Sequence, residues 1–151
     1  MRTRAWWTWT LLAATLAAWA IRLYRLDVQS LSYDEAVTVQ VAQQGLADLT
    51  RWTADDIQPP LYYYGIAGWV RLVGASEWAL RLPSAAWGVL ALPLIAILGR
   101  RLYGRRSGLL AAALTAGAPL YIYYSQDARM YTQLTTLGLL SAYSALRASE
   151  A

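Results

Sequence analysis

The sequence contains no cysteine, histidine, phenylalanine or lysine, and only 15% of its 151 residues are charged. Without cysteine the chain forms no disulfide and no thiolate metal site, although this leaves its redox compartment open. Without histidine it lacks the commonest general base and zinc ligand. Any acid–base chemistry must therefore fall to aspartate, glutamate or tyrosine. All 13 basic residues are arginine, which suits phosphate binding but also follows from a GC-rich genome.

Apolar residues dominate what is present. They make up 58% of the chain, which carries 8 tryptophans and 11 tyrosines. Soluble domains are usually about 45–50% apolar, with about a quarter of their residues charged. The few charges here gather between long uncharged runs, which is typical of an integral membrane protein built from helices. The expected fold class is therefore an all-α integral membrane protein.

Four apolar segments are predicted to cross the bilayer as helices: residues 5–24, 84–98, 108–124 and 131–146. The first is interpreted as a retained helix, because it lacks a signal-peptide exit and further spans follow it. Pro93 predicts a kink in the second. The connection 99–106 contains four arginines and is expected to be cytosolic by the positive-inside rule. The N-terminus is then cytosolic, and the long segment 25–83 is extracytoplasmic.

The segment 25–83 carries the signals of short interfacial helices. Ser32 and Glu35 fit a capping box, and the helix that follows is expected to stop at Gly45. Three further helices are predicted: 46–52, 61–73 after Pro59–Pro60 with Gly74 as its end, and 76–82 with Ser76 as its cap and Pro83 as its end. The stretch 61–73 is too short to span comfortably, so an interfacial or re-entrant helix is favoured.

Three polar clusters lie on the extracytoplasmic side: Asp34–Glu35, residues 55–64 and residues 125–131. The predicted topology brings all three to one face of the membrane. Carboxylates that converge there with arginine, tyrosine and glutamine would form a polar cleft beside lipid. A carboxylate could take a proton from an attacking hydroxyl, and an arginine or a bound metal could stabilise a departing phosphate.

Each cluster also has a purely structural interpretation, and the residues alone leave both open. Glu35 occupies the N3 position of the capping box, and Asp34 complements the helix dipole. The acids at 55–56 are typical of a solvated turn, and the tyrosines are typical of an interfacial aromatic belt. Asp127 and Arg129 fit a helix start with a snorkelling arginine.

Five short motifs occur in a characteristic order. They read Tyr-Asp-Glu at 33–35, Asp-Ile-Gln-Pro-Pro-Leu-Tyr-Tyr at 56–63, Ser-Glu-Trp-Ala-Leu-Arg-Leu-Pro-Ser at 76–84, Gly-Arg-Arg-Leu at 99–102 and Ser-Gln-Asp-Ala-Arg-Met-Tyr at 125–131. Together they resemble the N-terminal part of the GT-C membrane glycosyltransferases, in the protein-mannosyltransferase-like and aminoarabinose-transferase-like branch. The resemblance implies transfer of a sugar from a polyprenyl-phosphate donor, usually with inversion, to a protein or glycan acceptor outside the plasma membrane. Nucleic acid is not an expected partner.

The resemblance also implies roles for individual residues. Asp34 and Glu35 are the candidate catalytic pair, with Asp34 as base or metal ligand and Glu35 helping to fix the helix. The candidate substrate-binding residues are Asp56, Gln58, Tyr62, Tyr63, Arg81, Asp127, Arg129 and Tyr131. Gln58 stands where the family usually has histidine, and Asp127 where glutamate is more common. Asp34 and Asp127 are candidate ligands for Mg²⁺ or Mn²⁺.

Length separates this chain from the family it resembles, whose members are much longer and carry many more spans. The chain is therefore expected to be a fragment, or to work with a partner polypeptide that supplies the missing spans. One alternative is an inactive remnant that binds a polyprenyl lipid or a partner membrane protein. A small transporter subunit is less favoured, because the central parts of the predicted spans lack the ionisable residues that line a transport pathway.

Overall fold

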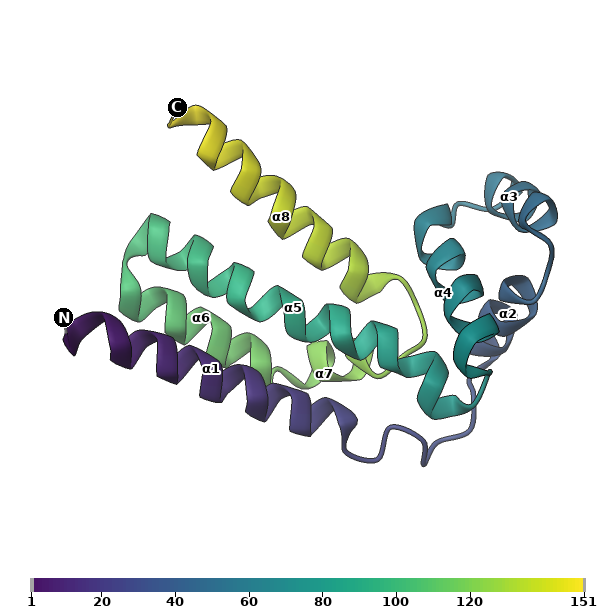
Figure 1. The fold of residues 1–151 in the computed structure, drawn as a ribbon, viewed down its shortest axis with the longest axis horizontal. Coiled ribbons are helices and arrows are strands. Elements are labelled where there is room, and N and C mark those ends of the chain that lie inside the picture. The colour runs from purple at the N-terminus through teal and green to yellow at the C-terminus, as the bar shows by residue number, and fades with distance from the viewer. Residues whose placement is uncertain (1, 151) are drawn as a thin grey trace.

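A computed structural model describes the backbone of residues 2–150 and the side chains of residues 5–150. All regular secondary structure in this part of the chain is helical, which confirms the all-α prediction. Its eight helices are α1 (Arg2–Leu23), α2 (Tyr33–Ala42), α3 (Leu46–Asp55), α4 (Pro60–Val73), α5 (Glu77–Tyr103), α6 (Arg105–Gly117), α7 (Pro119–Ser125) and α8 (Tyr131–Ser149). Helices α1, α5 and α6 lie side by side, while α2, α3 and α4 gather at one end of this bundle (Figure 1).

Helix α5 is the central element. Of the described residues, only this helix is long and apolar enough to cross a membrane, with a mean hydropathy of 1.9 over its most apolar stretch. It contains the predicted span 84–98. The other three predicted spans correspond to α1, to α6 with α7, and to α8, and their crossing of the bilayer stays a prediction. Helix α8 packs on α5 near its own start and diverges from it toward the C-terminus (Figure 1).

The prediction that a short helix ends before Pro83 is wrong, because Pro83 lies inside α5. Ser76 caps α5 as expected, with its hydroxyl accepting a hydrogen bond from the Ala79 amide at 3.3 Å. A proline in a helix removes the bond to the carbonyl four residues earlier, which here is that of Ala79. The indole N–H of Trp69 in α4 donates to this carbonyl at 2.8 Å. A hydrogen bond from α4 thus satisfies the Ala79 carbonyl, which Pro83 leaves without a backbone partner.

The predicted span 108–124 does not form one continuous helix, because it is broken between α6 and α7. Ala118 is extended, with φ −66° and ψ 117°, and Pro119 begins α7. A residue before proline is disfavoured in the helical region, which explains the break. In contrast, most of the predicted loop 99–106 is helical. The chain turns there at Gly104, whose φ of +91° suits glycine.

The capping box at the start of α2 is confirmed: the Ser32 hydroxyl accepts from the Glu35 amide, and the Glu35 carboxylate accepts from the Ser32 amide. Gly45 does not end this helix in a left-handed conformation as expected. Its φ is −65°, and it serves as the N-cap of α3. Gly74 does end α4, with φ +89°. Local signals therefore located most of the short helices correctly.

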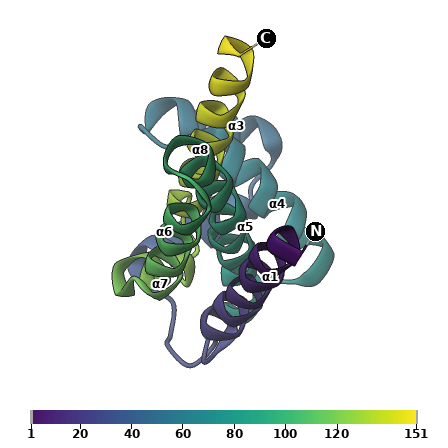
Figure 2. The same cartoon turned by 90° about the vertical axis from the view of Figure 1, so that its left-hand side faces the viewer.

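Two apolar cores support the fold. The first joins α2, α3 and α4 through Val41, Ala42, Leu49, Tyr62, Tyr63, Ile66 and Ala67. The second joins α1, α5 and α6 through small residues such as Ala18, Ala96 and Ala112. At the far end of the bundle, where α1 begins and α5 turns into α6 (Figure 2), Gly108 packs against the α5 backbone so closely that a side chain would overlap it.

Candidate functional site

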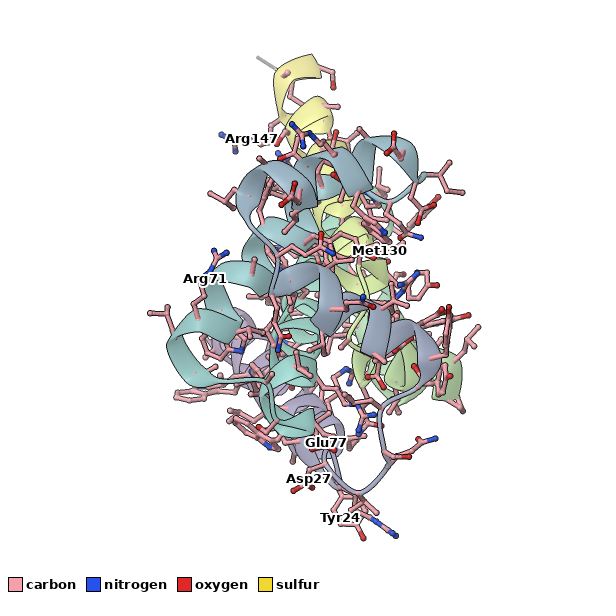
Figure 3. All side chains as sticks on the ribbon, turned by 90° about the vertical axis from the view of Figure 1, so that its right-hand side faces the viewer. Tyr24, Asp27, Arg71, Glu77, Met130 and Arg147 are labelled. Carbon is pink, nitrogen blue, oxygen red and sulfur yellow. The ribbon has the colours of Figure 1, made fainter. Side chains whose placement is uncertain are left out.

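The candidate site lies at the end of the bundle that carries α2, α3 and α4. Figure 3 looks onto this end with all side chains drawn. Tyr24, Asp27 and Glu77 lie together at its lower edge, where the chain passes from α1 toward α2. Met130, in the connection between α7 and α8, packs against the core of α2, α3 and α4. Three segments that are distant in sequence therefore meet here: the start of α2, the start of α5 and residues 126–130.

Glu35 ties these three segments together. Its carboxylate is 2% exposed and accepts from Arg81 at both oxygens, with Nε to Oε1 and Nη2 to Oε2 each at 2.7 Å. It also accepts from the amides of Ala128 at 3.0 Å and Ser32 at 2.9 Å. Burial by itself would raise the pKa of this carboxyl, but the hydrogen bonds from Arg81, Ser32 and Ala128 outweigh it and lower the pKa. Glu35 is held as a fully bonded carboxylate.

Arg81 completes this clamp from the side of α5. Besides its two bonds to Glu35, it donates to the carbonyls of Leu26 and Gln29, each at 2.8 Å, and of Ser30 at 3.2 Å. A guanidinium has five N–H donors, and these contacts occupy all three nitrogens of the Arg81 guanidinium. The observed contacts of Arg81 hold the connection between α1 and α2 in position. Its direct contact with a substrate stays a prediction.

Asp34, the neighbour of Glu35, is placed very differently. Its side chain is exposed, and its carboxylate makes no hydrogen bond or ion pair within the described residues. Its backbone carbonyl accepts from the Thr38 hydroxyl at 3.0 Å and, weakly, from Arg129 Nη1 at 3.5 Å. Two adjacent acids in one helical turn therefore differ completely: Glu35 is committed to the fold, and Asp34 is available to a ligand.

Asp127 and Arg129 lie close to Asp34. Asp127 is half-buried, and its pKa is raised to about 6, first by burial and then by the negative charges of Glu35 and Asp34. Arg129 is 7% exposed, and its Nη1 lies 3.4 Å from the Tyr63 hydroxyl. Its Nε is buried and has no hydrogen-bond partner in the part of the chain that the structure describes. Because a buried donor without a partner is costly, Arg129 has unused capacity to bind an acceptor.

Tyr62 and Tyr63 are both buried in the packing of α4. The Tyr62 hydroxyl lies 3.1 Å from Ser84 Oγ, and Ser84 in turn donates to the Arg129 carbonyl at 3.1 Å. The ring of Tyr63 packs edge-on against Trp52 with the ring centres 5.2 Å apart. The contacts of Tyr62 and Tyr63 help to hold Arg129 in position. Direct contact of either tyrosine with a substrate stays a prediction.

The remaining predicted residues lie at the margin of this cluster. Asp56 is exposed and accepts from the following amide of Ile57 at 2.8 Å. The Gln58 oxygen is buried without a partner. Tyr131 is exposed, and its ring lies 4.7 Å from that of Tyr124. No printed contact joins Asp56, Gln58 or Tyr131 to the carboxylate of Asp34 or Asp127 within the described chain.

The carboxylates do not by themselves form a metal cage. Across residues 5–150, no group of three or more aspartate or glutamate side chains is arranged to hold an ion. Mg²⁺ commonly binds through one or two carboxylates completed by water and substrate phosphate oxygens. Asp34 and Asp127 make no ion pair with the described residues, and their role as metal ligands stays a prediction.

Three hollows lie beside the cluster. A small polar pocket of about 70 Å³ is lined by Glu35, Arg81, Gln126 and Asp127, among others. Larger apolar hollows of about 210 and 340 Å³ share Trp69, Pro83 and Trp87, and Trp19 of α1 lines the larger one. The apolar hollows therefore run beside α5 from its polar end along its tryptophan-rich side.

Sequence reasoning missed several residues that build this end. Arg22 is fully buried and donates to Ser125 Oγ at 3.1 Å, while its Nη2 has no partner. Gln126 donates to the carbonyls of Arg22 and Tyr24. Both Ser125 and Gln126 belong to the motif 125–131, so their place in that motif was the available signal. Nothing in the local sequence pointed to Trp69 as a partner for α5.

Comparison with known families gives one match. A family model described as dolichyl-phosphate-mannose-protein mannosyltransferase matches residues 57–151. The matched range includes Gln58, Arg81, Asp127 and Arg129, and it begins after Asp34 and Glu35. No curated protein and no solved structure gives a significant match.

Proposed function

Because the chain belongs to the dolichyl-phosphate-mannose-protein mannosyltransferase family, we propose that it takes part in sugar transfer from a polyprenyl-phosphate donor to an acceptor hydroxyl at the extracytoplasmic face of a membrane. Family membership supports a glycosyltransferase of the mannosyltransferase type. The donor class, the orientation in the membrane and the residues that act are our proposal. In it, α1, α5, the α6–α7 pair and α8 cross the bilayer, with the arginine-rich end in the cytosol.

The observation that carries the proposal is the contrast between Asp34 and Glu35. A general base needs a carboxylate that can reach a substrate hydroxyl, and the Asp34 carboxylate is exposed, with no hydrogen-bond or ion-pair partner among the described residues. Glu35 is buried and bonded at both oxygens, so it acts as a positioning residue. Asp34 accepts the proton of the acceptor hydroxyl while that oxygen bonds to the anomeric carbon. The bond from this carbon to the phosphate oxygen breaks with inversion, and the polyprenyl phosphate leaves.

Arg129 is the cation proposed to stabilise the departing phosphate. Its Nε is buried and has no hydrogen-bond partner among the described residues, and its carbonyl accepts a hydrogen bond from Ser84. A fixed guanidinium directed at developing negative charge is an effective form of electrostatic catalysis. Asp127, with its pKa raised to about 6, lies near this charge. If a divalent cation takes part, Asp34 and Asp127 would contribute its protein oxygens, and the metal would supply further charge for the phosphate.

The apolar hollows beside α5 are proposed to accept the polyprenyl chain. They are lined by Trp69, Pro83 and Trp87, with Trp19 and Leu90 in the larger one. Hydrocarbon surfaces of this kind bind an isoprenoid by removing it from water or from loosely packed lipid. Since α5 is the helix suited to crossing the membrane, a lipid chain lying along it would keep its phosphate near the polar end.

The proposal is tested by a transfer assay in membranes that contain the chain. The membranes are supplied with radiolabelled mannosyl-phosphopolyprenol and a hydroxyl-bearing peptide, and label in the peptide is counted. Asp34→Asn is expected to lower the rate by about 10²–10⁴-fold, the usual contribution of a general base. Asp48→Asn is the matched control, because Asp48 is an exposed acid in the first turn of α3. Equal transfer by the wild type and Asp34→Asn would contradict the role of Asp34.

A second measurement covers the case in which no transfer is seen. A polyprenyl phosphate with a photoreactive chain is illuminated in the same membranes, and the labelled peptides are identified. We expect labelling in α5 near Pro83 and Trp87, which line both apolar hollows. Absence of both transfer and labelling would overturn the proposed function.

A further inference from the structure

We propose that the arginine-rich end of the bundle, opposite the candidate site, binds the phosphate head group of an anionic phospholipid. The binding pocket has a volume of about 230 Å³ and is lined by Trp7, Thr8, Arg100 and Arg105. These residues come from the start of α1, the last turn of α5 and the first turn of α6, which meet at the end shown in Figure 2. This inference does not depend on the proposed transfer reaction.

Trp7 organises the pocket. Its side chain is 7% exposed, and its indole N–H donates to the Arg105 carbonyl at 3.2 Å. The guanidinium of Arg100 lies over its ring, 5.0 Å from the centroid. Stacking of this kind uses the face of a guanidinium and leaves the N–H groups at its edge able to bind oxygen. Trp7 therefore holds Arg100 and the segment bearing Arg105 against each other.

The charges around this pocket favour an anion. Four arginines lie within residues 100–106, and the acid that pairs with one of them is Glu150, which binds Arg101. Arg100 makes no ion pair within the described part of the chain. Helix α6 begins beside the pocket, and Gly104 gives it no side-chain cap. The partial positive charge of that helix start adds to the arginines. A phosphate diester fits both the charge and the donors.

The position of the pocket favours a lipid over a soluble phosphate. Arg100 lies in the last turn of α5, the helix suited to crossing a membrane, so the pocket sits where that helix leaves the hydrocarbon layer. Tryptophan is typical of the head-group level, and basic pockets between membrane helices bind anionic lipid head groups. The exposed apolar side chains of Leu102 and Leu110 flank the arginines on α5 and α6 and can contact acyl chains.

The test titrates the purified chain in detergent, at physiological salt, with short-chain phosphatidylglycerol, short-chain phosphatidylcholine and glycerol phosphate. Native mass spectrometry counts the bound molecules. The wild type is expected to bind phosphatidylglycerol most tightly. The double variant Arg100→Gln/Arg105→Gln is expected to weaken that binding about thirtyfold, because each arginine near an anionic lipid contributes about fivefold. Arg106→Gln removes one charge, as does Arg100→Gln or Arg105→Gln alone, but from the exposed side of the same turn. It should change the binding by less than about twofold because salt screens exposed charges.

Circular dichroism establishes that each variant keeps its helices. If the double variant does not fold, the single variants replace it, each with an expected loss of about fivefold. Equal affinity for phosphatidylglycerol and phosphatidylcholine would overturn the proposal. An equal loss in Arg106→Gln would do the same, because binding would then follow net charge and not the pocket. If glycerol phosphate binds as tightly as the lipid, the site takes soluble phosphate esters and the lipid assignment is wrong.

Discussion

The two ends of the helical bundle each hold an arginine–glutamate pair, and the two pairs differ in almost every physical respect. At the candidate site, Arg81 and Glu35 have side chains only 6% and 3% exposed, and backbone groups of the α1–α2 and α7–α8 connections bind them. At the opposite end, Arg101 and Glu150 are 26% and 56% exposed, and Arg101 also contacts the ring of Tyr143. The first pair organises the chain, whereas the second lies on its surface.

Different interactions hold the two ends of the bundle together. The site end joins segments that are 46 and 93 residues apart through hydrogen bonds to one carboxylate. The arginine-rich end joins adjacent helices, α5 and α6, through close backbone packing at Gly99 and Gly108. At the site end, hydrogen bonds to Glu35 therefore hold together segments that apolar packing alone does not align. At the far end, Arg100 makes no ion pair with the described residues and is exposed to a ligand.

The largest effect is expected from breaking the buried pair. Glu35→Ala should lower the free energy of unfolding by about 3–5 kcal/mol, because it leaves Arg81 buried without a counter-charge. Thermal unfolding in detergent, followed by circular dichroism, measures this. Glu150→Gln is the control at the other end, where an exposed pair is worth about 0.5 kcal/mol. Replacing both partners, as in Glu35→Leu/Arg81→Met, should cost less than Glu35→Ala. Similar losses in Glu35→Ala and Glu150→Gln would remove the distinction between the two ends.

A smaller effect is expected from adding a side chain where α5 and α6 pack closely at the arginine-rich end. Gly108→Ala should destabilise the chain by about 1–3 kcal/mol, because the added methyl group overlaps the backbone of α5 near Ala96 and Arg100. Gly117→Ala lies at the other end of α6 and has nothing within 4 Å of the new carbon. It should be neutral or stabilising by up to about 1 kcal/mol, since alanine favours a helix. The same melting experiment compares the two, and equal melting temperatures would show that close packing of α5 and α6 is not what holds this end.

The smallest effect concerns the pH dependence of the site end. The pKa of Asp127 is raised from 3.8 to about 6 in the folded chain, so the folded state favours its protonated form. The cost of ionising it is absent below pH 3.8 and is fully present above pH 6. Asp127→Asn should therefore stabilise the chain above this window, by about 1 kcal/mol after allowing for solvent screening of a half-exposed group. Below the window it should have no such effect.

Melting temperatures of the wild type and Asp127→Asn measured across this pH range provide the check. Asp34→Asn should move the window to lower pH, because Asp34 is one of the negative charges that raise the pKa of Asp127. Parallel curves for the wild type and Asp127→Asn would show that Asp127 does not titrate in this range.

Much of the local structure was predictable because its causes are local. The capping box of Ser32 and Glu35, the end of α4 at Gly74 and the cap at Ser76 each depend on a few adjacent residues. The motif 125–131 likewise predicted that Asp127 and Arg129 approach the start of α2. The prediction failed where a distant group changed the outcome, as when Trp69 supplied the hydrogen bond that allows α5 to pass through Pro83.

The amino-acid sequence was enough to predict the all-helical class, the apolar character of α5, most helix starts and the glycosyltransferase family to which the chain belongs. These follow from composition, caps and short motifs, which do not depend on how the chain folds back on itself. The tertiary structure alone decided which of two adjacent acids is free. The Glu35 carboxylate is fully hydrogen-bonded because Arg81 and the Ala128 amide reach it. Among the described residues no such group reaches the carboxylate of Asp34, which is exposed. Hydrogen bonds between distant segments depend on their positions in space, and no local pattern encodes those positions.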